Sequence, residues 1–216
     1  MVRSSVVIVV ASLAFGACSS SKSAERPVTE RQLSDYFPLH LGDGWTYLAV
    51  SGPRKDSLRY DVVEQPEPRV FVMQVKPGSE QSPSAPHKVG KARMESRPRG
   101  IFDGTRYVLQ EPLEVGTKWT AILDARTAEH FEIIAVNVET SVPAGKFADC
   151  IVVRSAIKEP GEVTQLSDAT YCKGVGMVES IVTVAKPGKP TLTLGHLQLT
   201  VFESGGQRVF PKRLGE

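Results

Sequence analysis

The sequence predicts a mainly β protein, a single curved antiparallel sheet (a half-barrel or open barrel) with little helix. Short runs rich in β-branched and aromatic residues recur along the chain. Glycine and proline separate nearly all of these runs, as at Gly52-Pro53, Pro77-Gly78 and Pro187-Gly188. No long stretch has the i, i+3, i+4, i+7 apolar spacing of an amphipathic helix. The connections are short, so most neighbouring strands are expected to be antiparallel.

The first 17 residues have the composition of an export signal. Arg3 precedes an apolar run at residues 6–15, which is shorter than the roughly 20 apolar residues that a membrane-spanning helix needs. The run leads into Phe15-Gly16-Ala17-Cys18, which resembles the bacterial lipobox, although Phe15 stands where leucine is usual. The resemblance implies cleavage before Cys18 and attachment of fatty acyl chains such as palmitate to that residue. An ordinary signal peptide cleaved near Ala17 is the alternative.

The residues after Cys18 fit a membrane tether. Residues 19–27 are small and polar, the composition of a flexible linker, and acyl chains on one residue attach a protein firmly to a membrane. The residue directly after Cys18 is not aspartate. By resemblance to enteric sorting rules, this favours the outer membrane. We therefore expect a signal peptide at 1–17, a lipidated N-terminus and tether at 18–35, and a periplasm-facing antiparallel β domain at 36–210.

Length and charge limit the classes of function. The chain has 216 residues, of which 41% are hydrophobic and 23% charged, as in ordinary globular proteins. Removing residues 1–17 leaves 216 − 17 = 199 residues, enough for one domain with a sizeable core. The net charge is +2, and the loss of Arg3 reduces it to +1. Sequence-independent binding of nucleic acid needs a strongly basic surface, so no nucleic-acid partner is expected.

The expected elements follow one another closely along the chain. One helical turn is expected at residues 29–33, because Thr29 and Gln32 have the spacing of a capping box. Strands are then expected at residues 45–50, 58–64, 70–75, 92–102, 106–110, 118–123, 130–140, 148–158, 163–173, 177–185 and 191–203. The run at 129–140 is apolar on both faces, which suits a strongly curved sheet that wraps a core or covers a helix.

Lipidation of Cys18 would leave two cysteines, Cys150 and Cys172. An even pair in an oxidising compartment predicts a disulfide. Two free thiols and a redox-active pair are the alternatives, although the sequence has no C-x-x-C motif.

Pro160-Gly161 predicts a hairpin that sets the register of these cysteines. With a three-residue loop centred on Gly161, residues whose numbers sum to 322 face each other. Two independent pairs fit this register, Cys150 with Cys172 and Arg154 with Asp168. The second pair brings opposite charges together across the two strands.

One motif occurs twice. Residues 38–46 and 112–120 share the pattern P-L-x-[LV]-G-x-x-W-T, in which the glycine permits a turn and the tryptophan opens a strand. The two interpretations are a turn-into-strand device used twice and an ancient duplication that produced two half-sheets.

The segment at 81–99 predicts a loop followed by a basic strand. Its basic side chains outnumber its single acidic residue, Glu95. It offers a possible contact patch for anionic lipid headgroups, glycan phosphates or an acidic partner, formed by Lys88, Lys91, Arg93, Arg97 and Arg99. The alternative is a solvated edge that its charges protect from aggregation.

No catalytic, cofactor-binding or metal site is expected from sequence motifs. The four histidines, at positions 40, 87, 130 and 196, lack metal-ligand spacing, and no nucleophile elbow or P-loop occurs. Five aromatic residues are interpreted as core rather than as a ligand cage, namely Trp45, Tyr47, Trp119, Phe131 and Phe147.

Three sequence segments together resemble those of a loose group of bacterial envelope lipoproteins, some labelled TapB-like. They lie at residues 36–47, 142–150 and 171–180, and the resemblance covers most of residues 36 to 185. Its motifs are turns, a strand-opening tryptophan and a hairpin, so it implies no catalytic residue. It implies a curved antiparallel sheet, similar in outline to the half-barrel carriers of lipoproteins.

The sequence therefore favours a non-enzymatic outer-membrane lipoprotein. Its β domain would bind a protein partner or an apolar ligand on the concave side of the sheet, without a cofactor. One alternative is a hydrolase of envelope polymers whose site is assembled from distant residues, and another is a structural accessory of an envelope machine.

Overall fold

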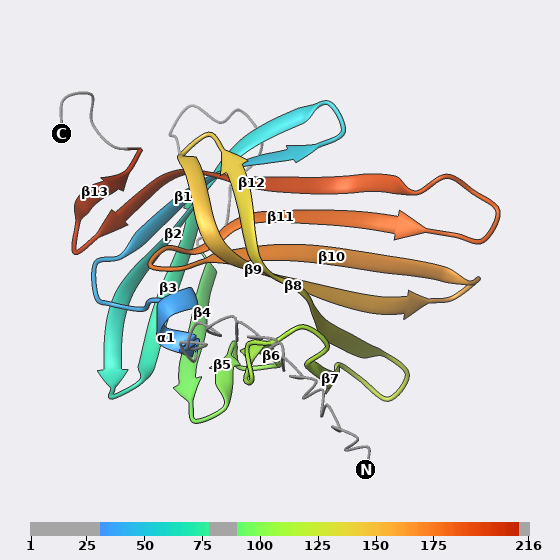
Figure 1. The fold of residues 1–216 in the computed structure, drawn as a ribbon, viewed down its shortest axis with the longest axis horizontal. Coiled ribbons are helices and arrows are strands. Elements are labelled where there is room, and N and C mark those ends of the chain that lie inside the picture. Colours follow the sequence, from blue (N-terminus) through green and yellow to red (C-terminus); the bar gives the residue numbers. More distant parts are fainter. Residues whose placement is uncertain (1–30, 78–89, 212–216) are drawn as a thin grey trace, which may run out of the picture. The chain divides into compact units, whose positions relative to one another are not determined.

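The computed structural model describes residues 31–77 and 90–211, which form one antiparallel sheet of 13 strands and one short helix (Figure 1). This confirms the predicted fold class. The elements are α1 (Leu33–Tyr36), β1 (Gly44–Ser51), β2 (Arg54–Glu67), β3 (Val70–Pro77), β4 (Gly90–Arg97), β5 (Gly100–Phe102), β6 (Tyr107–Gln110), β7 (Lys118–Ile122), β8 (Ala128–Val142), β9 (Gly145–Glu159), β10 (Val163–Cys172), β11 (Gly176–Ala185), β12 (Leu192–Ser204) and β13 (Gln207–Phe210). Within these ranges no helix has the length and apolarity needed to cross a membrane.

Each half of the chain contributes a six-stranded meander to the sheet. The strand order is β6-β5-β4-β3-β2-β1-β12-β11-β10-β9-β8-β7, and β13 pairs with the end of β12. The meanders are therefore joined where β1 pairs with β12, with Trp45 opposite Phe202. The two outer strands, β6 and β7, are consecutive in the chain. The indole N–H of Trp119 in β7 donates to the backbone oxygen of Tyr107 in β6 at 2.8 Å, so side chains link these edges across a seam.

The hairpin of β8 and β9 bends sharply at mid-length, and its far half crosses the neighbouring strands (Figure 1). Three register shifts interrupt its ladder between Ile133 and Thr140, and such bulges bend strands. The tip then reaches β12, where the backbone N–H of Ala144 donates to the oxygen of Leu199 at 2.9 Å. The bend and the contact with β12 explain why β8 carries apolar residues on both faces.

The hairpin of β9 and β10 has the predicted register. Cys150 pairs with Cys172 and forms the predicted disulfide. Arg154 pairs with Asp168, and its guanidinium makes two hydrogen bonds of 2.7 Å to the carboxylate. The loop comprises the three residues around Gly161.

Both copies of the repeated motif form the same turn, and each opens one meander. Gly42 and Gly116 have φ values of 88° and 90°, a conformation that glycine adopts readily. The N–H of Gly42 donates to the oxygen of Val62, and the N–H of Gly116 donates to the oxygen of Ile133. Each of these strand residues donates its own N–H to the residue after the glycine. In both copies the motif therefore forms a turn that leads into a strand, a feature that both interpretations of the repeat share.

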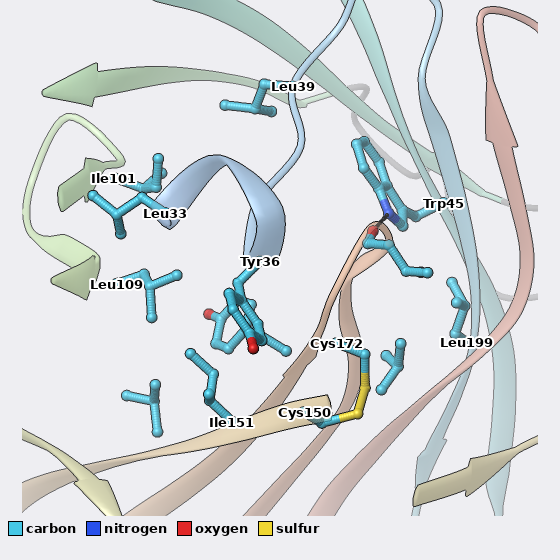
Figure 2. Close-up of a cluster of buried hydrophobic side chains, with 14 of the residues drawn as sticks. Leu33, Tyr36, Leu39, Trp45, Ile101, Leu109, Cys150, Ile151, Cys172 and Leu199 are labelled. Carbon is cyan, nitrogen blue, oxygen red and sulfur yellow. Dashed lines mark hydrogen bonds between the residues drawn. A yellow bond between two sulfur atoms is a disulfide. The ribbon is translucent and has the colours of Figure 1, made fainter. Parts of the chain in front are cut away.

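Helix α1 fills one end of the space that the sheet encloses. Figure 2 shows Leu33 directed towards Ile101 and Leu109, and Tyr36 directed towards Ile151 and the disulfide. All of these side chains are buried. The hydroxyl of Tyr36 donates to the carboxylate of Asp149 at 2.7 Å. This packed part is called the filled region below, and its members are Leu33, Tyr36, Ile101, Leu109, Ile151 and the disulfide.

Four details differ from the sequence prediction. The expected strand at 92–102 is two strands, because Pro98 and Arg99 form a turn that pairs Arg97 with Gly100. The helix begins at Leu33, and Gln32 before it makes no side-chain capping bond. Thr29 lies outside the described residues. The compact unit starts at Arg31, within the predicted tether, and β13 follows a Gly205-Gly206 turn that the sequence analysis did not include.

Candidate functional site

Beyond the filled region, the concave face of the sheet lines a cavity of about 540 Å³ that is partly open to solvent. This volume is within the range of small-molecule sites, roughly 300–1,000 Å³. Its walls come from both meanders. The side chains that line it are mainly apolar, namely Phe37, Trp45, Tyr47, Tyr60, Met73, Ala92, Met94, Val108, Phe131, Val153, Ile157, Ala169, Tyr171, Met177, Val182 and Leu197, with Asp103, Arg106, Glu129, Ser155, Gln165, Ser167 and Ser180 as the polar members.

The lining forms because alternate residues of each strand point to the same face. On β10 the inward residues are every second one, from Gln165 to Tyr171. On β9 the inward residues Val153, Ser155 and Ile157 follow Ile151 of the filled region at the same spacing. The cavity is thus a continuation of the filled region along the same strands.

The strand register arranges this lining in layers along β8, β9 and β10. Ile151 and Tyr171 form the layer next to α1, where the rings of Tyr171 and Phe37 lie 5.9 Å apart. Two layers further on, Phe131, Ser155 and Ser167 are cross-strand neighbours. The last layer contains Glu129, Ile157 and Gln165. Apolar side chains therefore dominate near α1, and polar ones gather farther from it.

Every methionine after Met1 lines the cavity. Met73, Met94 and Met177 come from β3, β4 and β11. Methionine is unbranched and polarizable, so it adapts its shape to different apolar partners. This composition suits a wall that accommodates a flexible apolar ligand.

One charged cluster lies where the cavity meets the seam. The guanidinium of Arg106 forms ion pairs with Glu129 of β8 and with Asp103, the latter at 3.3 Å. Glu129 is 4% exposed, and the carboxylate of Asp103 also accepts the backbone N–H groups of Thr105 and Arg106. The cluster contains two carboxylates and one guanidinium, and it joins the turn before β6 to β8.

Burial keeps the tyrosines of the lining in their neutral form. Burial raises the pKa of Tyr171 to about 12 and raises the pKa of Tyr47 well above its ordinary value. It also raises the pKa of Tyr60. The hydroxyl of Tyr47 donates to the backbone oxygen of Met177 at 2.7 Å. These groups therefore act as hydrogen-bonding, uncharged parts of the wall.

Four basic residues of the predicted contact patch are described, and none of them lines this cavity. They lie on β4 and in the turn after it. Lys91 pairs with Glu64 at 2.8 Å, and Arg93 pairs with Glu95 at 3.0 Å. Arg97 also pairs with Glu95, at 2.7 Å, and its guanidinium lies 3.7 Å from the centre of the Phe102 ring. Hydrogen bonds from Arg97 and Arg93 lower the pKa of Glu95.

Carboxylates therefore balance much of the positive charge on this strand. Arg99 is exposed in the turn that follows β4. Lys88 and the lipidation residue Cys18 lie outside the described residues. In the described ranges, no group of three or more histidine, cysteine, aspartate or glutamate side chains could hold a metal ion.

Three of the five aromatic residues interpreted as core line the cavity, namely Trp45, Tyr47 and Phe131. Trp119 stacks on Phe131 at 5.1 Å, and Phe147 packs against Phe210. Sequence reasoning did not identify the serines of the wall. The predicted hairpin register contained the necessary signal, because 155 + 167 = 322 places two serines opposite each other among inward apolar residues.

No protein-family model matches the chain, and no curated protein matches its sequence. One similar solved structure is that of a "putative lipoprotein" from Parabacteroides distasonis, with a TM-score of 0.48 and 12% sequence identity. The match covers 80% of this chain and 100% of that one. Membership of the TapB-like group stays a prediction from the three sequence segments.

Proposed function

We propose that the protein is a lipid-anchored envelope protein whose β domain binds an apolar ligand in the cavity and catalyses no reaction. The cavity itself is the observation that carries this proposal. The space is partly open to solvent, and its walls are mainly apolar. Apolar surface that faces water costs free energy, which a ligand covering it would recover. The adaptable methionine wall adds support for a binding role.

The charges in the cavity support a non-enzymatic role. Both carboxylates of the lining, Asp103 and Glu129, are engaged by Arg106. The described lining offers no second cation or histidine beside them. These groups are better suited to holding the seam together than to catalysis.

The anchor part of the proposal rests on the sequence at residues 15–18 and predicts an acylated Cys18 on the outer membrane, with the β domain in the periplasm. Mass spectrometry of protein extracted from membranes should find the first 17 residues absent and acyl chains on Cys18. An intact export signal, or an unmodified mature N-terminus, would remove this part of the proposal without affecting the cavity.

The binding part is tested with protein carrying Cys18→Ser, which cannot be acylated at that residue. A dye that fluoresces in apolar surroundings should bind with a stoichiometry of one. Ala169→Phe places a ring inside the cavity and should abolish binding. Ala156→Phe is the matched control, because Ala156 lies between the inward residues Ser155 and Ile157 and faces the other side of β9. Equal binding by the two variants would contradict a site in the cavity.

A further inference from the structure

On the basis of the proposed function, we infer that the ligand is an uncharged amphiphile, held with its apolar part towards α1 and its polar group on the hydroxyls of Ser155, Ser167 and Ser180. These three serines are called the hydroxyl cluster. The inference depends on where the polar groups lie, on their lack of partners and on the balance of charge around them.

The hydroxyl cluster is a continuous polar strip across three neighbouring strands. Ser155 of β9 and Ser167 of β10 are direct cross-strand partners. The hydroxyls of Ser167 and Ser180 of β11 lie 3.4 Å apart. Gln165 lies two residues from Ser167 on the same face of β10. A small number of convergent polar groups in an apolar wall is typical of sites that orient a ligand.

The side chains of this strip have hydrogen-bonding capacity to spare. Among the described residues, neither Ser155 nor Gln165 makes a side-chain hydrogen bond, and the contact of Ser167 with Ser180 is long. Ser180 is only 9% exposed. Ser155, Gln165 and Ser167 are half-buried, so their unused hydrogen-bonding groups can be reached from the cavity. A hydroxyl, ester or amide group of a ligand could therefore hydrogen-bond to them.

The distribution of apolar groups gives the ligand its direction. Phe37, Tyr171 and Met177 form the part of the cavity next to α1. The hydroxyl cluster lies farther along the same strands, as the cross-strand pairs show. An acyl chain that entered first would contact the apolar part, and its polar group would then reach the serines.

The charges favour a neutral polar group over a charged one. Asp103 and Glu129 place two carboxylates around the single guanidinium of Arg106, so the cluster repels an anion. The remaining formal charge of 1 − 2 = −1 is shared by two carboxylates that Arg106 already contacts, so a cation would find only a partly neutralised counter-ion there. A charged group buried without a counter-ion loses much hydration free energy. An uncharged group avoids both costs.

The test compares three probes of equal chain length with protein carrying Cys18→Ser. They are a monoacylglycerol, the corresponding fatty acid at about pH 8, and the corresponding alkyl trimethylammonium ion. We expect the monoacylglycerol to displace the dye at a concentration at least about tenfold lower than either charged probe. Equal or tighter binding of the fatty acid or of the cation would overturn the inference and leave the proposed cavity function intact. If none of the probes displaces the dye, the inference fails, whereas dye binding that Ala169→Phe abolishes would still support the proposed function.

The hydroxyl cluster is tested by the double variant Ser155→Ala/Ser167→Ala. It should weaken monoacylglycerol binding by about tenfold, because each lost hydrogen bond accounts for a factor of a few. Its urea-unfolding curve should nearly match that of the unsubstituted protein, which would show that the fold is intact. Ser141→Ala is the matched control, since Ser141 is exposed in the far half of β8. Undiminished monoacylglycerol binding by the double variant would refute the assignment of the polar group to these serines.

Discussion

Ile151 and Ile157 lie six residues apart on the same face of β9, yet their surroundings differ. Ile151 is fully buried in the filled region, where α1 covers the sheet. Ile157 lines the cavity, and no helix among the described residues covers it. One continuous face of the sheet is therefore closed at one end and hollow at the other. The comparison predicts that shortening a side chain of this face costs more stability beside α1 than at the hollow end.

The largest expected effect comes from shortening these two isoleucines. Ile151→Ala should lower the free energy of unfolding by about 4 kcal/mol, because it removes buried methyl groups and leaves a void. Ile157→Ala should lower it by less than about 1 kcal/mol, since its side chain already borders open space. Urea unfolding measures both. Similar losses for the two variants would show that the hollow end is packed as tightly as the filled region.

The next largest effect on the free energy of unfolding is expected from two cross-strand pairs of the β9–β10 hairpin. Cys150→Ala/Cys172→Ala removes the disulfide and should lower the free energy of unfolding by about 3 kcal/mol, because the unfolded chain gains conformational freedom over a 22-residue separation. Ser155→Ala/Ser167→Ala should change it by less than about 1 kcal/mol. Urea unfolding under oxidising conditions gives both values. A loss for the serine pair that equals the loss for the cysteine pair would contradict this comparison.

The smallest effect concerns pH and two buried tyrosines. The pKa of Tyr36 is raised to about 12 by burial and then by its hydrogen bond to Asp149, and the pKa of Tyr171 is raised to about 12 mainly by burial. Both folded pKa values exceed the ordinary value of 10.0, so the two neutral hydroxyls favour the folded state. This contribution to the free energy of unfolding is complete below pH 10 and is lost as the pH rises towards 12. Each tyrosine should contribute a loss of about 1 kcal/mol between pH 9 and 11.

Phenylalanine variants separate the two tyrosines. In each variant, the free energy of unfolding should fall less between pH 9 and 11, by the contribution of the tyrosine that was replaced. Tyr36→Phe should also cost about 1 kcal/mol at pH 8, because it removes the bond to Asp149. Tyr171→Phe should cost little at pH 8, since no hydrogen bond of its hydroxyl occurs among the described residues. Urea unfolding at each pH measures these values, and an unchanged alkaline slope in both variants would contradict the assignment.

Local signals predicted a large part of the fold. The β9–β10 hairpin followed from one turn and two complementary pairs, because both strands lie close together in the chain. The pairing of β1 with β12 had no such signal, since its partners are far apart in sequence. The bend in β8 could not be placed because its residues are apolar on both faces. Helix α1 has only four residues, too few for a periodic pattern.

The cavity was not predictable from residue types alone. Tryptophan, methionine and isoleucine fill cores and line cavities equally well. Trp45, Tyr47 and Phe131 are buried in the core, as predicted, and they also line the cavity. Whether they meet one another or leave a space depends on how far α1 extends over the sheet. The serine pair and Gln165 were local signs of polar groups on the inner face, because their register follows from the hairpin.

The junction of the two meanders has a consequence for how the protein is made. Thr200 of β12 hydrogen-bonds to the backbone of Thr46 in β1 across 154 residues of chain. A chain that is synthesised from its N-terminus completes the first meander well before β12 exists. Until then, β1 presents an unpaired edge, which can recruit strands of other molecules. Premature termination before residue 192 should therefore yield aggregation rather than a smaller stable domain.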